Sequence, residues 1–185
     1  MPRQTDKANY QFPDGFKLEV STDNGSTWTD IGIVAAGATA TLNWDEMRID
    51  AGNYLGLIKK AKNFTCALAP SALWNWDPAK IVKVFDGLLA SSAATTPKTG
   101  TDLDFAGTEA SLDLSDVQVR MTHYSNSALT TIDWQFTLYN ANIDAGATFN
   151  WKGVNEDGLD EITVSFTGRP DPADGFKLMK LFKAS

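Results

Sequence analysis

The segment TIDWQFTLY, residues 131–139, alternates apolar and polar side chains along its whole length. A period of two is typical of a β-strand that buries one face and exposes the other to water. Residues 132–138 alternate between the two predicted faces of the strand. The buried face holds Ile132, Trp134, Phe136 and Leu138, and the wet face holds Asp133, Gln135 and Thr137.

The same period recurs through the rest of the chain. It is found in FKLEV (16–20), VQVRMTHY (117–124), EITVSF (161–166) and FKLMKLF (176–182). The short connection SNSAL (125–129) favours a hairpin between the strands on either side of it. Half-buried antiparallel strands of this kind predict an all-β fold, a β-sandwich or barrel.

One segment departs from this period. In WDPAKIVKVFDGLLA (76–90), Asp77 is a candidate N-cap, Pro78 fits the first helical position, and the apolar residues that follow have helical spacing. We therefore expect one amphipathic helix. The small and polar residues that follow it predict a long loop over about 90–110, in a single domain that spans residues 1–185.

STDNGSTW (21–28) fits the Ser-x-Asp-x-Gly-x-Thr-Trp spacing that recurs in sialidase propellers. A propeller repeats its motif in several blades, whereas this chain of 185 residues has one copy. The motif is better explained as a tight hairpin turn. Asn24 and Gly25 suit left-handed backbone, and Asp23 can bond its own main chain.

Negative charge is concentrated in one block. Residues 102–161 hold eleven acids and two bases, a net of −9, in a chain whose net charge is −7. Such a surface repels nucleic acid, which disfavours a DNA-binding role. The alternative is a solvated acidic face that keeps the protein soluble.

No catalytic or metal-binding constellation is evident. Cys66 lies in the apolar run FTCALA and fits a buried, inert thiol, and His123 fits a hydrogen-bonded structural imidazole. NEDGLDE (155–161) lacks the acid spacing of an EF-hand, and one histidine with one cysteine cannot make a usual zinc site. We expect no enzymatic activity, no metal and no cofactor, and the sequence shows neither a signal peptide nor a membrane span.

The order of these segments resembles the tail tube proteins of long-tailed bacteriophages, which share their fold with the tube protein of type VI secretion. The resemblance rests on the early hairpin LEVSTDNGSTWTDIGIV (18–34), the mid-chain WDPAKIVKVF (76–85) and the closing DEITVSFTGRPDPADGFKLMKLF (160–182). It implies a tail-tube-like subunit that forms stacked rings, expected to be hexameric, around a negatively charged channel through which DNA passes as non-specific cargo.

The resemblance also implies roles for particular residues and partners. Its partners would be further copies of the chain and the terminator, tape measure and sheath proteins, in a virion tail assembled in the host cytoplasm. The predicted lumen-lining residues are Asp116, Asp133, Gln135 and Thr137. The predicted inter-ring contacts in the long loop are Ser91, Thr96, Lys98, Asp102 and Asp104.

Two alternatives stay open at this point. A carbohydrate-binding or adhesin-type β-sandwich would use exposed aromatic side chains such as Trp74, Trp76 and Trp151 to stack on sugar rings. Another tail structural protein, such as a terminator, would share the general fold. The orientation of the three tryptophans separates the first alternative from the tube.

Overall fold

The computed structural model describes residues 16–34, 37–50, 57–70, 89–93, 101–105, 116–125, 129–144, 146–151 and 161–184, together with Asp77, Lys80 and Phe85. All the elements in these ranges are strands, and all their pairings are antiparallel, so the predicted all-β class is confirmed. The strands are β1 (Phe16–Ser21), β2 (Thr29–Val34), β3 (Ala38–Asp50), β4 (Leu57–Pro70), β5 (Leu89–Ala93), β6 (Thr101–Phe105), β7 (Val117–Tyr124), β8 (Ile132–Ile143), β9 (Thr148–Asn150), β10 (Glu161–Thr163), β11 (Phe166–Gly168) and β12 (Met179–Lys183).

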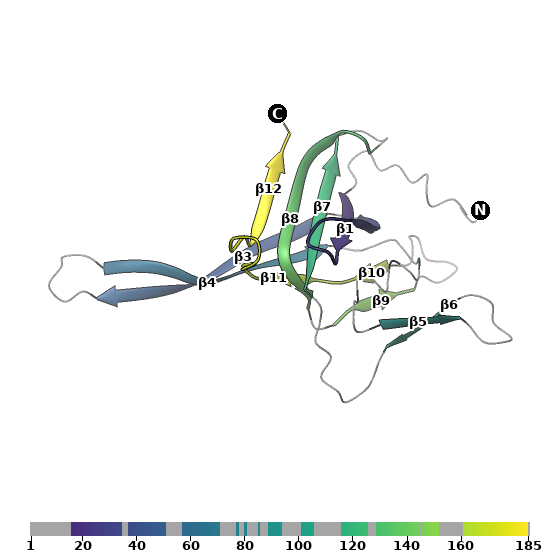
Figure 1. The fold of residues 1–185 in the computed structure, drawn as a ribbon, viewed down its shortest axis with the longest axis horizontal. Helices are drawn as coiled ribbons and strands as arrows, with labels where there is room; N and C mark the ends of the chain where they lie inside the picture. The colour runs from purple at the N-terminus through teal and green to yellow at the C-terminus, as the bar shows by residue number, and fades with distance from the viewer. Residues whose placement is uncertain are drawn as a thin grey trace.

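Most strands belong to one large sheet (Figure 1). Its order is β2-β1-β7-β8-β11-β4-β3, and β12 also pairs with β8. Two small hairpins, β9–β10 and β5–β6, stand apart from this path. The sheet is therefore built around β8, which has three different partners.

β8 changes partner along one of its edges. Residues 134–138 pair with β12, whereas 141–143 pair with β11, and β7 follows the opposite edge. Asn140, at the change, has a positive φ of 42°. Gly168 of β11 packs so tightly there that an added Cβ would come within 2.5 Å of Leu138 Cδ1. This close approach lets one strand belong to two parts of the sheet.

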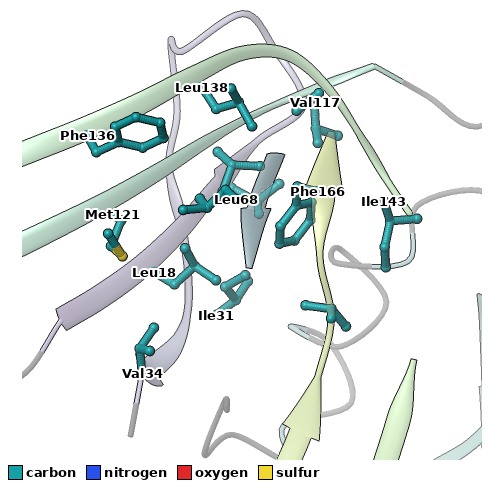
Figure 2. Packing of buried hydrophobic residues seen from close by; sticks show 14 of the residues in the cluster. Leu18, Ile31, Val34, Leu68, Val117, Met121, Phe136, Leu138, Ile143 and Phe166 are labelled. Carbon is teal, nitrogen blue, oxygen red and sulfur yellow. The ribbon is translucent and has the colours of Figure 1, made fainter. Parts of the chain in front are cut away.

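The core lies where these strands face each other (Figure 2). Leu18 of β1, Leu68 of β4, Leu138 of β8 and Phe166 of β11 are all fully buried. Phe166 is opposite Ile143 on one side and Leu68 on the other, so it joins the β8 and β4 halves of the sheet. Three-residue β11 thus connects the two halves by main-chain pairing along both of its edges and by the buried Phe166 ring.

The STDNGSTW turn is the predicted hairpin between β1 and β2. Asn24 and Gly25 take the positive φ values of 54° and 82° that the turn needs. The Asp23 carboxylate accepts hydrogen bonds from the Thr27 hydroxyl and amide and from the Ser21 hydroxyl. These bonds, the Thr27 hydroxyl first, lower the pKa of Asp23 to about 2.

β3 and β4 form a long hairpin that projects from the body of the molecule (Figure 1). Its register shifts by one residue between Asn43 and Asp45, where Asn63 on β4 has a positive φ of 53°. The Asn63 amide donates to the Asp45 carboxylate at 2.7 Å across this bulge. The sequence pattern did not lead us to expect this projecting hairpin, which we call the arm.

Two predicted strands are divided or shortened in the structure. EITVSF is divided into β10 and β11, which pair with different neighbours, and Val164 and Ser165 lie between them. FKLMKLF does not begin as a strand, because the Phe176 amide donates to the Asp171 carbonyl at 2.6 Å and closes a turn. β12 therefore starts at Met179.

The predicted helix lies almost wholly outside the described residues. Within it, the Lys80 amide donates to the Asp77 carbonyl at 3.0 Å. The predicted loop over about 90–110 needs a correction, because β5 and β6 lie in it and pair from Leu89 with Phe105 to Ala93 with Thr101. Main-chain pairing makes a hairpin from residues with little apolar patterning of their own. That the chain is a single domain stays a prediction.

Replacing Phe166 by alanine tests the role of β11. Phe166→Ala should lower the free energy of unfolding by about 3 to 5 kcal/mol, because the ring fills the junction between β4 and β8. Urea unfolding followed by tryptophan fluorescence measures the change. Phe176→Ala is the matched control, since Phe176 is 71% exposed, and it should change stability little. Equal losses in the two variants would contradict this account of the core.

Candidate assembly surface

β12 is an exposed strand at the edge of the sheet. It pairs with β8 along Met179–Lys183, and its outer edge has no partner among the described residues. All five side chains of β12 are exposed, including Leu181 at 66% and Phe182 at 46%. An open edge with apolar side chains is a template for pairing with another chain.

Asp133 of β8 fastens the end of β12. Its carboxylate forms an ion pair with Lys183, its carbonyl accepts from the Ala184 amide at 2.8 Å, and His123 Nδ1 lies 3.1 Å from its Oδ2. The hydrogen bond from Lys183 is the largest cause that lowers the pKa of Asp133. Asp133 therefore joins β7, β8 and β12.

A bulge places Asp133 in this position. His123 is opposite Trp134 and Tyr124 is opposite Ile132, so Asp133 has no directly opposed residue on β7. The strict alternation predicted for this segment is interrupted at Asp133, because the extra residue turns the backbone. Its carboxylate is thereby brought to His123 and Lys183.

The predicted wet face of β8 is polar, but it is not open to solvent at its centre. Thr137 and Thr122 are buried, and the half-buried Gln135 donates to the Thr122 hydroxyl at 3.0 Å. We expected Gln135 and Thr137 to face water. The correction follows from the neighbouring strands, because Thr137 lies between Arg120 and Lys180 in the register and Thr122 lies opposite Lys17.

An ion-pair network occupies the same face. Buried Glu19 of β1 pairs with Arg120 at 2.7 Å and with Lys17 at 3.0 Å. The Arg120 guanidinium also lies over the Trp28 ring, 4.1 Å from its centroid. Lys17 also pairs with Asp30 of β2 at 3.6 Å, so this cluster joins β1, β2 and β7, and the Glu19 carboxylate at its centre is paired with two cations.

The other predicted site residues lie apart from this network. Asp116 is exposed just before β7 and accepts from the Asn142 amide at 2.8 Å. Ser91 is in β5, and Asp102 and Asp104 are in β6. Thr96 and Lys98 lie outside the described residues.

The β3–β4 hairpin exposes large apolar side chains that our sequence analysis missed. Trp44 is 54% exposed, Leu42 42% and Phe64 39%. Leu42 is directly opposite buried Cys66, so the apolar face of the core continues outward along the arm. The alternation of apolar and polar residues in ATLNW (40–44) would have indicated a strand with an apolar face. Nothing in the sequence shows, however, that the protein core ends before this strand does.

A second exposed apolar site lies at the end of β9. The Phe85 and Phe149 ring centroids are 6.1 Å apart, and those of Phe149 and Trp151 are 5.9 Å apart, all in stacked orientation. Phe85 is buried, whereas Trp151 is 67% exposed. The stack therefore leads from the core to the surface. Trp74 and Trp76, the other tryptophans of the carbohydrate-binding alternative, lie outside the described residues.

The reactive residue types are engaged in packing. Cys66 is buried beside Met179, with 3.8 Å between the sulfur atoms, and burial raises the pKa of its thiol. His123 packs against Phe16 and Trp134, with centroids 5.1 and 5.8 Å away. The predictions of a buried thiol and a hydrogen-bonded imidazole are confirmed. Among the described residues no group of three or more His, Cys, Asp or Glu could hold a metal ion, and no helix could span a membrane.

Asp133→Asn tests how β12 is held. The variant loses the ion pair with Lys183, so the amides of β12 should exchange with solvent several-fold faster, as measured by hydrogen–deuterium exchange with mass spectrometry. Because the folded-state pKa of Asp133 is lowered, its contribution is complete above the ordinary carboxyl pKa and is lost as pH falls through the folded-state value. Glu46→Gln, which removes the exposed ion pairs with Arg48 and Lys59 on the hairpin, is the control. Unchanged exchange in Asp133→Asn would show that main-chain pairing alone holds β12.

Comparison with known proteins gives matches among solved structures alone. No family model matches the chain, and no curated protein does. The chain is similar to one from an extracellular contractile injection system, the PVC sheath–tube complex in its extended state, with 8% identity, a TM-score of 0.47, and coverage of 98% of this chain and 99% of that one.

Two further matches come from the anti-feeding prophage. A chain of its six-fold symmetrised baseplate is 14% identical with a TM-score of 0.46, covering 91% of this chain and 92% of that one. A chain of its tube-terminating cap is 9% identical with a TM-score of 0.43, covering 90% and 88%. The similarity extends over nearly the whole chain in each case.

Proposed function

We propose that this chain is a structural subunit of a phage-type tail tube, which self-assembles into stacked rings. Six subunits per ring is the number that the sequence resemblance implies. This role requires binding surfaces that are uncovered in a single chain and covered by neighbouring copies in the assembly. It requires no catalytic residue, which agrees with the packed state of Cys66 and His123.

The observation that carries the proposal is the pair of open edges on one run of strands. β2-β1-β7-β8-β12 are hydrogen-bonded in sequence, and within the described residues β2 pairs only with β1 and β12 only with β8. If β12 of one subunit pairs with β2 of the next, the sheets of a ring become continuous. Unpaired main-chain groups at both edges are then satisfied, which favours closure of the ring.

In this arrangement the polar face of the continuous sheet would line the channel. Asp116 and Asp133 remain the proposed lining residues. Gln135, half-buried and bonded to Thr122, and Thr137, which is buried, would lie behind the lining surface. The charged residues described on this face include Lys17, Glu19 and Arg120, whose positive and negative charges nearly cancel. A negative channel would therefore draw its field from acids elsewhere in the 102–161 block, with Asp116 the exposed example. DNA would pass such a channel without specific binding.

The β5–β6 hairpin takes the place of the predicted loop as the contact between rings. Ser91, Thr96, Lys98, Asp102 and Asp104 are the residues proposed to make it. Terminator, tape measure and sheath proteins are the proposed partners, and the virion tail is the proposed location.

Proline substitutions at two adjacent positions of β12 test the edge pairing. Neighbouring residues in a strand direct their N–H groups to opposite edges, so one of Lys180→Pro and Leu181→Pro breaks pairing with β8 and the other blocks only the open edge. Sedimentation velocity measures assembly, and thermal unfolding identifies which variant is which. The proline that leaves the melting temperature unchanged should abolish assembly. If that variant assembles as the unmodified chain does, edge pairing is not the contact.

Charge reversal tests the channel. Tubes made from Asp116→Lys should retain fluorescently labelled DNA that unmodified tubes do not, because lysines repeated around a ring would bind phosphate. Retention should fall as salt rises. Glu46→Lys, on the projecting hairpin, is the control for charge alone. Equal retention by both variants would place Asp116 outside the channel.

A further inference from the structure

We propose that neighbouring subunits exchange β12. Residues 178–184 of one copy leave their own chain and take the place beside β8 of the next copy, so the occupant of that place is a second copy of this chain. This inference rests on the proposed self-assembly and deepens it. The exchanged strand binds the neighbour through the edge that pairs with β8, and its outer edge stays in position for β2.

β12 buries none of its own side chains. All five residues from Met179 to Lys183 are exposed, whereas β8 beneath them contributes Phe136 and Leu138 to the core. Leu178, just before the strand, is half-buried against the core. Departure of this segment therefore takes no fully buried side chain out of the core. It leaves an open edge on β8, which the same strand of another copy can fill.

The contacts that hold β12 can be remade between two copies. Residues 179–183 pair with β8 along the main chain. At the end of the strand, the Asp133 carboxylate pairs with Lys183 and the Asp133 carbonyl accepts from the Ala184 amide. None of these contacts requires both partners to belong to one chain. The segment that connects β12 to the body therefore decides between the exchanged and unexchanged forms.

That connecting segment, residues 169–177, forms a strained turn, and we call it the hinge. The Phe176 amide donates to the Asp171 carbonyl at 2.6 Å, and the Asp171 amide donates to the Lys177 carbonyl at 2.8 Å. The closed turn holds Phe176 at a φ of 60°, which is unfavourable for a bulky side chain. Its ring is 71% exposed and gains little from packing. A hinge that does not turn back is free of this strain.

The hinge is also suited to an extended form. Arg169 and Asp171 each precede a proline, and a residue before proline is biased toward extended backbone. Nine extended residues span roughly 30 Å. If β12 and β2 join the sheets of two copies, the same place on the next β8 is five strand spacings away, about 24 Å. The hinge is therefore long enough for the exchange.

A reversed ion pair distinguishes exchange from edge pairing alone. Asp133→Lys with Lys183→Asp in one chain restores the pair within that chain, but it places like charges together when β12 is exchanged with an unmodified chain. The two chains, mixed as dilute monomers before assembly, should therefore assemble with their own kind. Neighbours of unlike type should be about tenfold rarer than random mixing gives. Native mass spectrometry with a heavy-isotope label in one chain measures the ratio.

The two single substitutions should select each other. Asp133→Lys alone and Lys183→Asp alone each place like charges within one chain. Exchange between these two variants restores an aspartate–lysine pair at both junctions. In an equal mixture, unlike neighbours should therefore outnumber like ones about tenfold or more. A charge effect on pairing with β2 would not produce this preference, because it does not bring residue 133 to residue 183.

A second ion pair provides the matched control. Glu46→Lys with Lys59→Glu reverses an exposed pair within the β3–β4 hairpin, and this chain should mix at random with the unmodified one. Thermal unfolding confirms that each variant is folded.

The hinge offers a test that leaves Asp133 and Lys183 unchanged in one of the two chains and adds no charge. With Phe176→Gly in both chains of the mixture, the closed turn loses its strain, so the sorting should weaken about fivefold. Phe176→Ala removes the same ring but keeps a left-handed residue with a side chain, so it should sort as the parent chains do. Equal effects of the two substitutions would show that hinge strain does not drive the exchange.

The results separate this inference from the proposed function. If the reversed and unmodified chains mix at random within rings or tubes, the exchange is wrong and the tube proposal stands. If they sort but form only small closed oligomers, the exchange stands and the tube is wrong. If the unmodified chain stays monomeric at every concentration, both are wrong. Sorting of the reversed chain, together with mutual selection by the two single variants, supports the exchange.

Discussion

The fold depends on β8, which has more hydrogen-bonding partners than one pair of neighbours allows. β7 follows one edge of it, while β12 and β11 divide the other edge at Asn140. This division requires the close approach of Gly168 to Leu138, and it brings Phe166 into the middle of the core. Every other described part of the large sheet attaches to β8 directly or through β11 and β7.

The same division leaves one strand edge and several apolar side chains of the chain uncovered. β12 covers part of β8 but contributes only exposed side chains, and it is held by main-chain pairing and by Asp133. The β3–β4 hairpin joins the body through three-residue β11 and then continues beyond the core with Leu42, Trp44 and Phe64 exposed. A chain with two open edges and an apolar arm has surfaces that suit assembly with further copies.

Local patterns predicted the elements that depend on local chemistry. β7 has the predicted bounds, the 21–28 turn forms through Asn24 and Gly25, and Phe136 and Leu138 of β8 are buried as predicted. What the sequence could not show depends on distant residues. The Asp133 bulge arises from pairing with β7, the burial of Thr137 arises from neighbouring strands, and the exposure of Trp44 arises because none of the other described strands covers it. Period-two patterns do not indicate which strands pair.

The central claim is that copies of this chain complete one another. Negative-stain electron microscopy of the purified, unmodified chain over a range of concentrations tests it most directly, with a sizing column at the lowest concentration. The account predicts rings or tubes with a central hole at high concentration and smaller species when dilute. A monomer at every concentration, with β12 and the β3–β4 hairpin equally exposed to limited proteolysis throughout, would contradict it.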